Sequence, residues 1–114
     1  MNDESGKIEA LPSAEVAGLL KRGEVLLIDV REPAEYAAER IPGALLYPLS
    51  TFDPLTLPAD GARRVVFHCG SGKRSLTAAE KCVAAGRPHA AHMAGGVTKW
   101  KASGLPIIAP GQIP

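Results

Sequence analysis

Residues 64–85 constrain the fold of this 114-residue chain more than any other stretch. The segment begins with the apolar run Val65-Val66-Phe67, which is too short for a helix and favours a β-strand. A turn with two glycines follows, and residues 76–85 then carry apolar side chains at helical spacing. Gly86 ends this run, because glycine readily takes the positive φ found just past a helix. The pattern predicts a strand, a tight turn and a helix, with Cys69 at the first position of the turn.

The composition of this turn predicts a reactive cysteine and an anion-binding site. Backbone N–H groups in a strand-to-helix turn point into one concavity, and the helix start adds partial positive charge. A cysteine in such surroundings is shifted toward the thiolate, the nucleophilic form. We therefore expect Cys69 to be catalytic, although many free cysteines are simply small buried hydrophobic residues. The expected substrate-binding residues are the rest of the turn, namely Gly70, Ser71, Gly72, Lys73, Arg74 and Ser75.

Length, charge and cysteine content restrict the classes of protein to consider. The chain is long enough for one domain with a core and too short for two. A formal net charge of +1 and an aromatic content of 4% give no reason to expect a nucleic-acid or membrane partner. The two cysteines form no CxxC pair, so we expect no metal site and no cofactor. Without a signal peptide or an apolar run of membrane-spanning length, a cytoplasmic protein with reduced cysteines is expected.

Strands and helices alternate along the rest of the chain, which predicts an α/β fold with a parallel sheet. Strands are expected over residues 8–11, 25–30, 44–49, 65–67 and 89–94, and helices over 13–22, 33–40, 76–85 and 97–102. Ser13 is expected to cap the first helix, and residues 50–62 to form a loop with one helical turn. Residues 1–7 are predicted to be a flexible arm, 8–108 the domain and 109–114 an extended tail. Asp29 and Cys69 both end predicted strands, so they can meet at the carboxyl edge of the sheet.

Four groups of residues, in this order and at these spacings, make the chain resemble the single-domain rhodaneses, which are sulfurtransferases. The groups are Asp29-Val30-Arg31 with Glu35-Tyr36; Ile41-Pro42-Gly43-Ala44; the turn 69–75; and Gly95-Gly96 with Trp100 and Gly104-Leu105-Pro106. The resemblance covers residues 8–108 and implies a central sheet of about five parallel strands flanked by helices on both faces. Arg40 and Leu46 depart from the family pattern, which often has histidine and asparagine there.

The resemblance also implies that Cys69 carries a persulfide during turnover. The expected donor is a small sulfur-containing anion such as thiosulfate, and the expected acceptor is cyanide or a thiol. A sulfur-relay protein is a further candidate partner. Asp29 and Arg31 are expected to shape the turn without touching substrate, with Asp29 pairing with a nearby cation or accepting backbone N–H bonds.

Two other functions fit part of the same pattern. Cysteine phosphatases share a cysteine followed by an arginine, but their motif has five intervening residues, whereas four separate Cys69 from Arg74. A rhodanese-like binding or regulatory module without catalysis is the second alternative. Such modules usually lack the cysteine, which this chain retains together with Arg74.

The remaining polar and aromatic residues have simple structural interpretations. His68 is expected to pack beside the turn, with a role as catalytic base as the lesser alternative. His89 and His92 would lie on opposite faces of a strand and therefore are not expected to share a metal. Cys82 is expected to be a buried helix residue and Trp100 a core residue.

Overall fold

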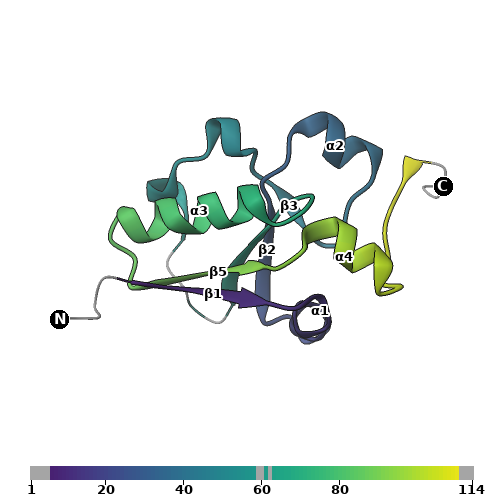
Figure 1. Cartoon of the computed structure of the whole chain (residues 1–114), viewed down its shortest axis with the longest axis horizontal. Helices are drawn as coiled ribbons and strands as arrows, with labels where there is room; N and C mark the ends of the chain where they lie inside the picture. Colours follow the sequence, from purple (N-terminus) through teal and green to yellow (C-terminus); the bar gives the residue numbers. More distant parts are fainter. Residues whose placement is uncertain (1–5, 59–60, 62, 111–114) are drawn as a thin grey trace.

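The computed structural model describes residues 6–58, 61 and 63–110 and contains one five-stranded parallel sheet. The strands are β1 (Lys7–Leu11), β2 (Val25–Asp29), β3 (Leu45–Leu46), β4 (Arg64–His68) and β5 (His89–Met93). The helices are α1 (Ser13–Lys21), α2 (Pro33–Ala38), α3 (Lys73–Ala84) and α4 (Gly96–Ala102). The strand order is β1-β5-β4-β2-β3, so β1 and β3 form the edges and β5, β4 and β2 lie inside the sheet (Figure 1). The predicted α/β class and parallel sheet are confirmed.

Alternate residues of the inner strands supply the two halves of the core. Leu27 of β2 and Val66 of β4 belong to one apolar cluster, which α1 and α4 complete with side chains that include Val16 and Trp100. On the other face, Phe67 and its neighbours pack beneath α3 with the residues Ile28, Val65, Ala78, Ala79 and Cys82. Because successive residues of a strand point to opposite faces, a continuous apolar run serves both clusters. The predicted helical cover on both faces, and the core positions of Trp100 and Cys82, are confirmed.

Several predicted boundaries are wrong. The residue at the N-cap of α1 is Pro12, while Ser13 is the first helical residue and its buried hydroxyl has no hydrogen-bond partner among the described residues. Strand β3 has two residues instead of the six expected, and two 3₁₀ turns, Leu49–Thr51 and Pro54–Thr56, follow it. The strand is short because Pro48 lacks the N–H that a longer strand would need.

The ends of the chain also differ in detail from the expectation. Lys7, assigned to the arm by the sequence pattern, is the first residue of β1 and lies in register with His89. At the other end, Ile108 forms an antiparallel bridge with Arg40, just before the predicted tail. Residues 1–5 of the predicted arm and 111–114 of the predicted tail lie outside the described residues. Within the part of the chain that is described, no helix is long and apolar enough to cross a bilayer.

Candidate active site

The turn between β4 and α3 is shaped by glycines from two segments of the chain. Gly72, with φ of 109°, is the N-cap residue of α3, and this left-handed conformation disfavours residues with a side chain. Gly96 presses against the turn from the start of α4, where an added Cβ would lie 2.3 Å from the Cys69 carbonyl oxygen. The N–H groups of Val97 and Thr98 donate to the carbonyl oxygens of Cys69 and Gly70 at 2.9 and 3.1 Å. The start of α4, which follows Gly95, therefore holds the cysteine turn in place.

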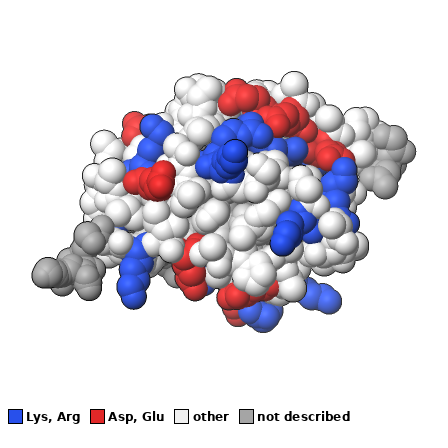
Figure 2. All heavy atoms as spheres, in the orientation of Figure 1, with Lys and Arg blue, Asp and Glu red and all other residues white. Residues whose placement is uncertain are grey.

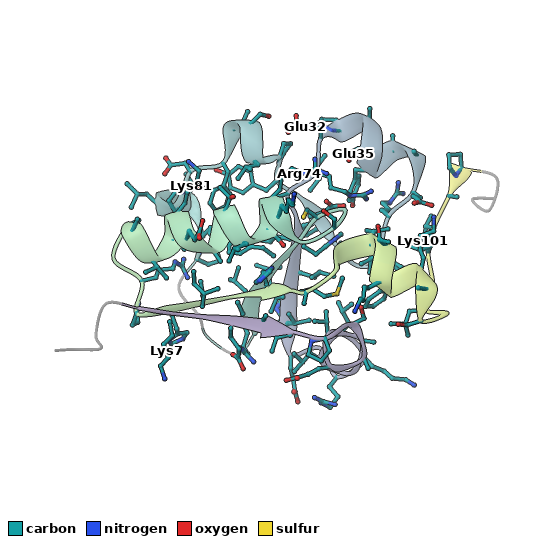
Figure 3. All side chains as sticks on the ribbon, in the orientation of Figure 1. Lys7, Glu32, Glu35, Arg74, Lys81 and Lys101 are labelled. Atoms are coloured by element: carbon teal, nitrogen blue, oxygen red, sulfur yellow. The ribbon has the colours of Figure 1, made fainter. Side chains whose placement is uncertain are left out.

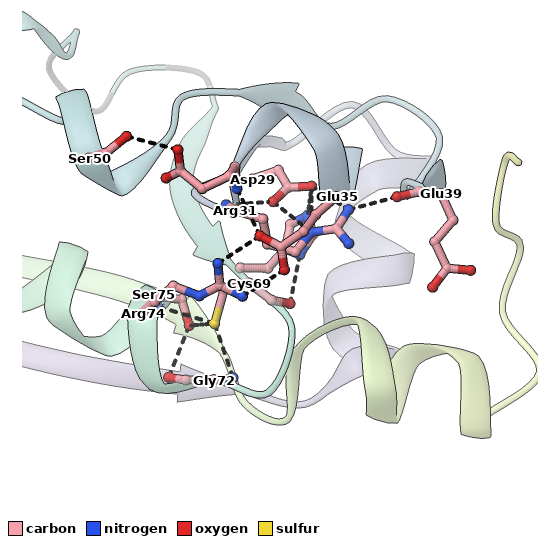
Figure 4. A network of polar contacts seen from close by, with 11 residues as sticks. Asp29, Arg31, Glu35, Glu39, Ser50, Cys69, Gly72, Arg74 and Ser75 are labelled. Atoms are coloured by element: carbon pink, nitrogen blue, oxygen red, sulfur yellow. Dashed lines mark hydrogen bonds and ion pairs between the residues drawn. The ribbon is translucent and has the colours of Figure 1, made fainter. Parts of the chain in front are cut away.

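The sulfur of Cys69 lies in a cradle of hydrogen-bond donors, as Figure 4 shows. The backbone N–H groups of Gly72 and Ser75 donate to Sγ at 3.1 and 3.3 Å, and the Ser75 hydroxyl oxygen lies 3.7 Å from it. Burial, with 1% of the residue exposed, raises the pKa of the Cys69 thiol, but donors from Ser75, Gly72 and Ser71 lower that pKa by more. The net pKa lies below its ordinary value. The geometry therefore favours a thiolate here, in agreement with the expectation from the sequence.

This shift predicts the pH dependence of thiol modification. Alkylation of Cys69 by iodoacetamide should reach half of its maximal rate at a pH below the usual cysteine pKa of about 8.5, because only the thiolate reacts. The rate is measured by mass spectrometry of the Cys69 peptide across a pH series. In denaturant the midpoint should rise to the ordinary value. An unshifted midpoint in the folded protein would refute the proposed cradle.

Arg74, the second residue of α3, forms a two-pronged ion pair with Glu35 of α2. Its two terminal nitrogens donate to the two carboxylate oxygens at 2.8 and 3.0 Å. The hydrogen bond from Arg74 lowers the pKa of Glu35 to about 2, and Glu35 also accepts the Glu32 backbone N–H at 2.9 Å. Figure 3 shows Arg74 and Glu35 facing each other from α3 and α2. In Figure 2, acidic and basic atoms accordingly lie side by side in this region.

Glu35 is one residue of the site that sequence reasoning missed as a functional group. It was noted only as part of the family pattern, since 39 residues separate it from Arg74. The sequence signal that could have found it is a carboxylate in the first turn of a helix that follows a neighbouring parallel strand. Lys73, in contrast, is exposed at the first position of α3.

Asp29 and Arg31 form a buried ion pair behind the turn. The Asp29 carboxylate is fully buried and accepts Nε and a terminal nitrogen of Arg31 at 3.0 and 2.8 Å, together with the Arg31 backbone N–H at 2.9 Å. Arg31 also donates to the Glu39 carbonyl oxygen at 2.7 Å, which ties the end of β2 to the end of α2. The expected pairing of Asp29 with a cation and a backbone N–H is thus present. Whether this pair supports catalysis stays a prediction.

The two buried histidines near the turn have different surroundings. His68 ends β4, and its Nε2 lies 3.5 Å from an Asp29 oxygen; burial lowers the pKa of His68, against the opposing charge of Asp29. His92 lies in β5 with its Nδ1 2.9 Å from the Ser75 hydroxyl oxygen. Among the described residues, no group of three or more histidine, cysteine, aspartate or glutamate side chains is arranged to hold a metal ion.

Comparison with known proteins agrees with the fold. Residues 13–103 match the family model described as a rhodanese-like domain. A protein of Allochromatium vinosum named "Sulfurtransferase" is 38% identical over 87 residues, which is 76% of this chain and 81% of that protein. An uncharacterized protein of Synechocystis sp. is also 38% identical, over 79% of this chain, but the match spans only half of that protein's length.

A solved structure from Rhodopseudomonas palustris, described as a protein of unknown function and "Possible Tyrosine Phosphatase", superposes with a TM-score of 0.73 at 29% identity. The superposition covers 89% of this chain and 85% of that one. The protein is an α/β domain with a parallel sheet. A turn that begins at Cys69 follows the carboxyl end of its inner strand β4. The chain belongs to the rhodanese-like domain family.

Proposed function

We propose that this protein is a sulfurtransferase that moves a sulfane sulfur from a donor such as thiosulfate to cyanide or a thiol. The Cys69 thiolate attacks the outer sulfur of the donor, a new S–S bond forms, and the original S–S bond breaks with its electron pair leaving on sulfite. The acceptor then attacks the outer sulfur of the Cys69 persulfide, and Cys69 leaves as thiolate. This is covalent catalysis in two half-reactions.

The observation that carries the proposal is the set of N–H donors around the Cys69 sulfur. Donors held by the backbone stabilise an anionic sulfur without moving during the reaction. In the proposed reaction the N–H groups of Gly72 and Ser75 stabilise the Cys69 thiolate, both when it attacks the donor and when it leaves as the acceptor takes the outer sulfur. The name of the Allochromatium relative agrees with such an activity.

The spacing of the turn favours sulfur transfer over phosphate-ester hydrolysis. Four residues lie between Cys69 and Arg74, one fewer than in the cysteine phosphatases. A shorter loop makes a tighter cradle, which suits one additional sulfur atom and a small anion beyond it. A rhodanese-like binding module without catalysis would not require an activated thiol.

Mass spectrometry after incubation with thiosulfate tests the proposal directly. The expected result is a mass increase of one sulfur atom on Cys69, removed by cyanide with formation of thiocyanate. No adduct with thiosulfate or any other sulfane donor would support the binding module instead. Hydrolysis of an aryl phosphate without a sulfur adduct would support the phosphatase.

Arg74 is expected to bind the oxyanion of the donor, although both of its terminal nitrogens contact Glu35. Arg74→Ala should lower kcat/KM for thiosulfate by about 10- to 150-fold, the equivalent of one charge-assisted hydrogen bond of about 1.5–3 kcal/mol. Arg74→Lys should retain part of the activity, because lysine keeps the charge without the planar fork. Single-turnover kinetics should place the loss in the donor half-reaction.

Lys81→Ala is the matched control, since Lys81 lies on the same helix and Figure 3 shows it away from the Arg74 and Glu35 pair. It should leave both half-reactions unchanged. A normal donor step in Arg74→Ala would mean that Arg74 only anchors α2 through Glu35. The donor would then depend on Lys73 and the backbone N–H groups.

A further inference from the structure

The hydroxyl of Ser75 contacts three polar groups at the start of α3. Its oxygen lies 3.1 Å from the Gly72 carbonyl oxygen, 2.9 Å from Nδ1 of His92 and 3.7 Å from the sulfur of Cys69. Ser75 and Cys69 are buried, and only 7% of His92 is exposed. These contacts join His92, on strand β5, to the sulfur of Cys69 through one side chain.

Counting hydrogens shows which group donates in each contact. A serine hydroxyl has one hydrogen and can accept two hydrogen bonds. The Gly72 carbonyl cannot donate, so the Ser75 hydrogen serves this contact and Nδ1 of His92 must donate to Oγ. The Cys69 thiol then donates to the second acceptor position of Oγ. Every contact is satisfied only if the hydrogen of a neutral His92 ring is on Nδ1.

Ionisation of Cys69 changes the role of Ser75 but not that of His92. Once the thiol proton has left, the Ser75 hydroxyl can turn from the Gly72 carbonyl toward the anionic sulfur. A bare Nδ1 would compete with the sulfur for that hydrogen at 2.9 Å, whereas an Nδ1–H leaves it available. A donor on the oxygen also polarises the hydroxyl, which strengthens its own donation.

We propose that His92 is a positioning residue whose Nδ1–H holds the Ser75 hydroxyl so that its hydrogen can be donated to the sulfur of Cys69. The inference deepens the proposed function, because it concerns the nucleophile of that reaction. The residues in register with His92 on the neighbouring strands, Ala10 and Phe67, are apolar. Burial lowers the pKa of His92, which keeps the ring neutral near pH 7.

The test compares the pH profile of Cys69 alkylation by iodoacetamide in single variants. His92→Leu should raise the pKa of Cys69 and slow alkylation near neutral pH by about 2- to 10-fold, the range of one neutral hydrogen bond. His92→Asn should restore most of the rate, since its amide N–H can occupy the place of Nδ1–H. His89→Asn is the matched control on the same strand and should leave the profile unchanged. Circular dichroism checks that each variant is folded.

Two further measurements distinguish positioning from a general structural effect. In a Ser75→Ala background, His92→Leu should cause no additional change in the pKa of Cys69. In the wild-type protein, ¹⁵N NMR of the histidine rings should show His92 neutral with its hydrogen on Nδ1. This measurement needs no variant to fold.

Three results would overturn the inference. They are a hydrogen on Nε2 of His92 with Nδ1 bare, an unchanged or lowered Cys69 pKa in His92→Leu, and an equal effect of His92→Leu without the Ser75 hydroxyl. The alkylation measurements use the free thiol and the NMR measurement uses the imidazole ring, so no readout depends on sulfur transfer. Failure of the thiosulfate experiment would remove the proposed function and leave this inference standing, and the converse also holds.

Discussion

Cys69→Ser is expected to abolish sulfur transfer, and Cys82→Ser is expected to retain it. A serine hydroxyl is hardly ionised at neutral pH and cannot carry the transferred sulfur as a persulfide, so neither half-reaction can proceed. Cys82 lies in α3 with 1% of its surface exposed and packs in the core cluster beneath that helix. Thiocyanate formation from thiosulfate and cyanide measures the activity, and mass spectrometry locates the adduct.

The cysteine comparison needs a control for folding, because a serine at position 82 places a hydroxyl in an apolar cluster. Such burial without a hydrogen bond costs about 1–3 kcal/mol in proteins. Cys82→Ala, which adds no polar group, serves as the second variant. A folded Cys82→Ala protein without activity would replace the single-cysteine reaction with one that uses both thiols. Full activity in Cys69→Ser would exclude Cys69 as the nucleophile.

Asp29→Ala is expected to lower the free energy of unfolding by about 3–5 kcal/mol, the usual effect of removing one partner of a buried ion pair. The substitution leaves Arg31, a residue that is only 4% exposed, without the carboxylate that its guanidinium contacts directly. It also removes the acceptor for the Arg31 backbone N–H. Urea denaturation followed by circular dichroism measures the change.

Glu24→Gln provides the matched control, because the ion pair of Glu24 with Arg22 is exposed on both sides. Exposed pairs contribute about 0–1 kcal/mol, so this variant should unfold close to the wild-type denaturant concentration. If Asp29→Ala were no less stable than Glu24→Gln, the buried pair would not hold the ends of β2 and α2 together. The Asp29 and Arg31 pair would then matter only for the chemistry of the cysteine turn.

The segment from β4 to α3 could be predicted well because its signals are local, although α3 begins at Lys73 and not at residue 76 as expected. A short apolar run, two glycines and a helical apolar spacing each lie within a few residues of the structure they specify. The same holds for Cys69 at the end of β4, since the carboxyl ends of parallel strands meet at one edge. The donors on its sulfur come from Gly72 and Ser75, three and six residues away.

The polar partners of this segment could not be predicted, because they come from other parts of the chain. Glu35 is 39 residues from Arg74, and His92 is 17 residues from Ser75. Both contacts depend on which helix and which strand lie next to the turn, and sequence spacing does not encode that. The length of β3 is overestimated for a different reason: the apolar run predicts a strand, but Pro48 lacks the N–H that a longer strand would need.

The position of β5 between β1 and β4 has a consequence for how the protein is made. The first strand of the chain pairs with β5, more than 80 residues later, so it has no partner in the sheet until that part has been synthesised. Val97 and Thr98, which hold the carbonyl groups of the cysteine turn, come later still. Until this region has left the ribosome, β1 lacks its partner strand β5. The turn at Cys69 then also lacks its hydrogen bonds from Val97 and Thr98. We expect the lowered pKa of Cys69, followed by alkylation of stalled nascent chains across a pH series, to appear only after residue 98 has emerged.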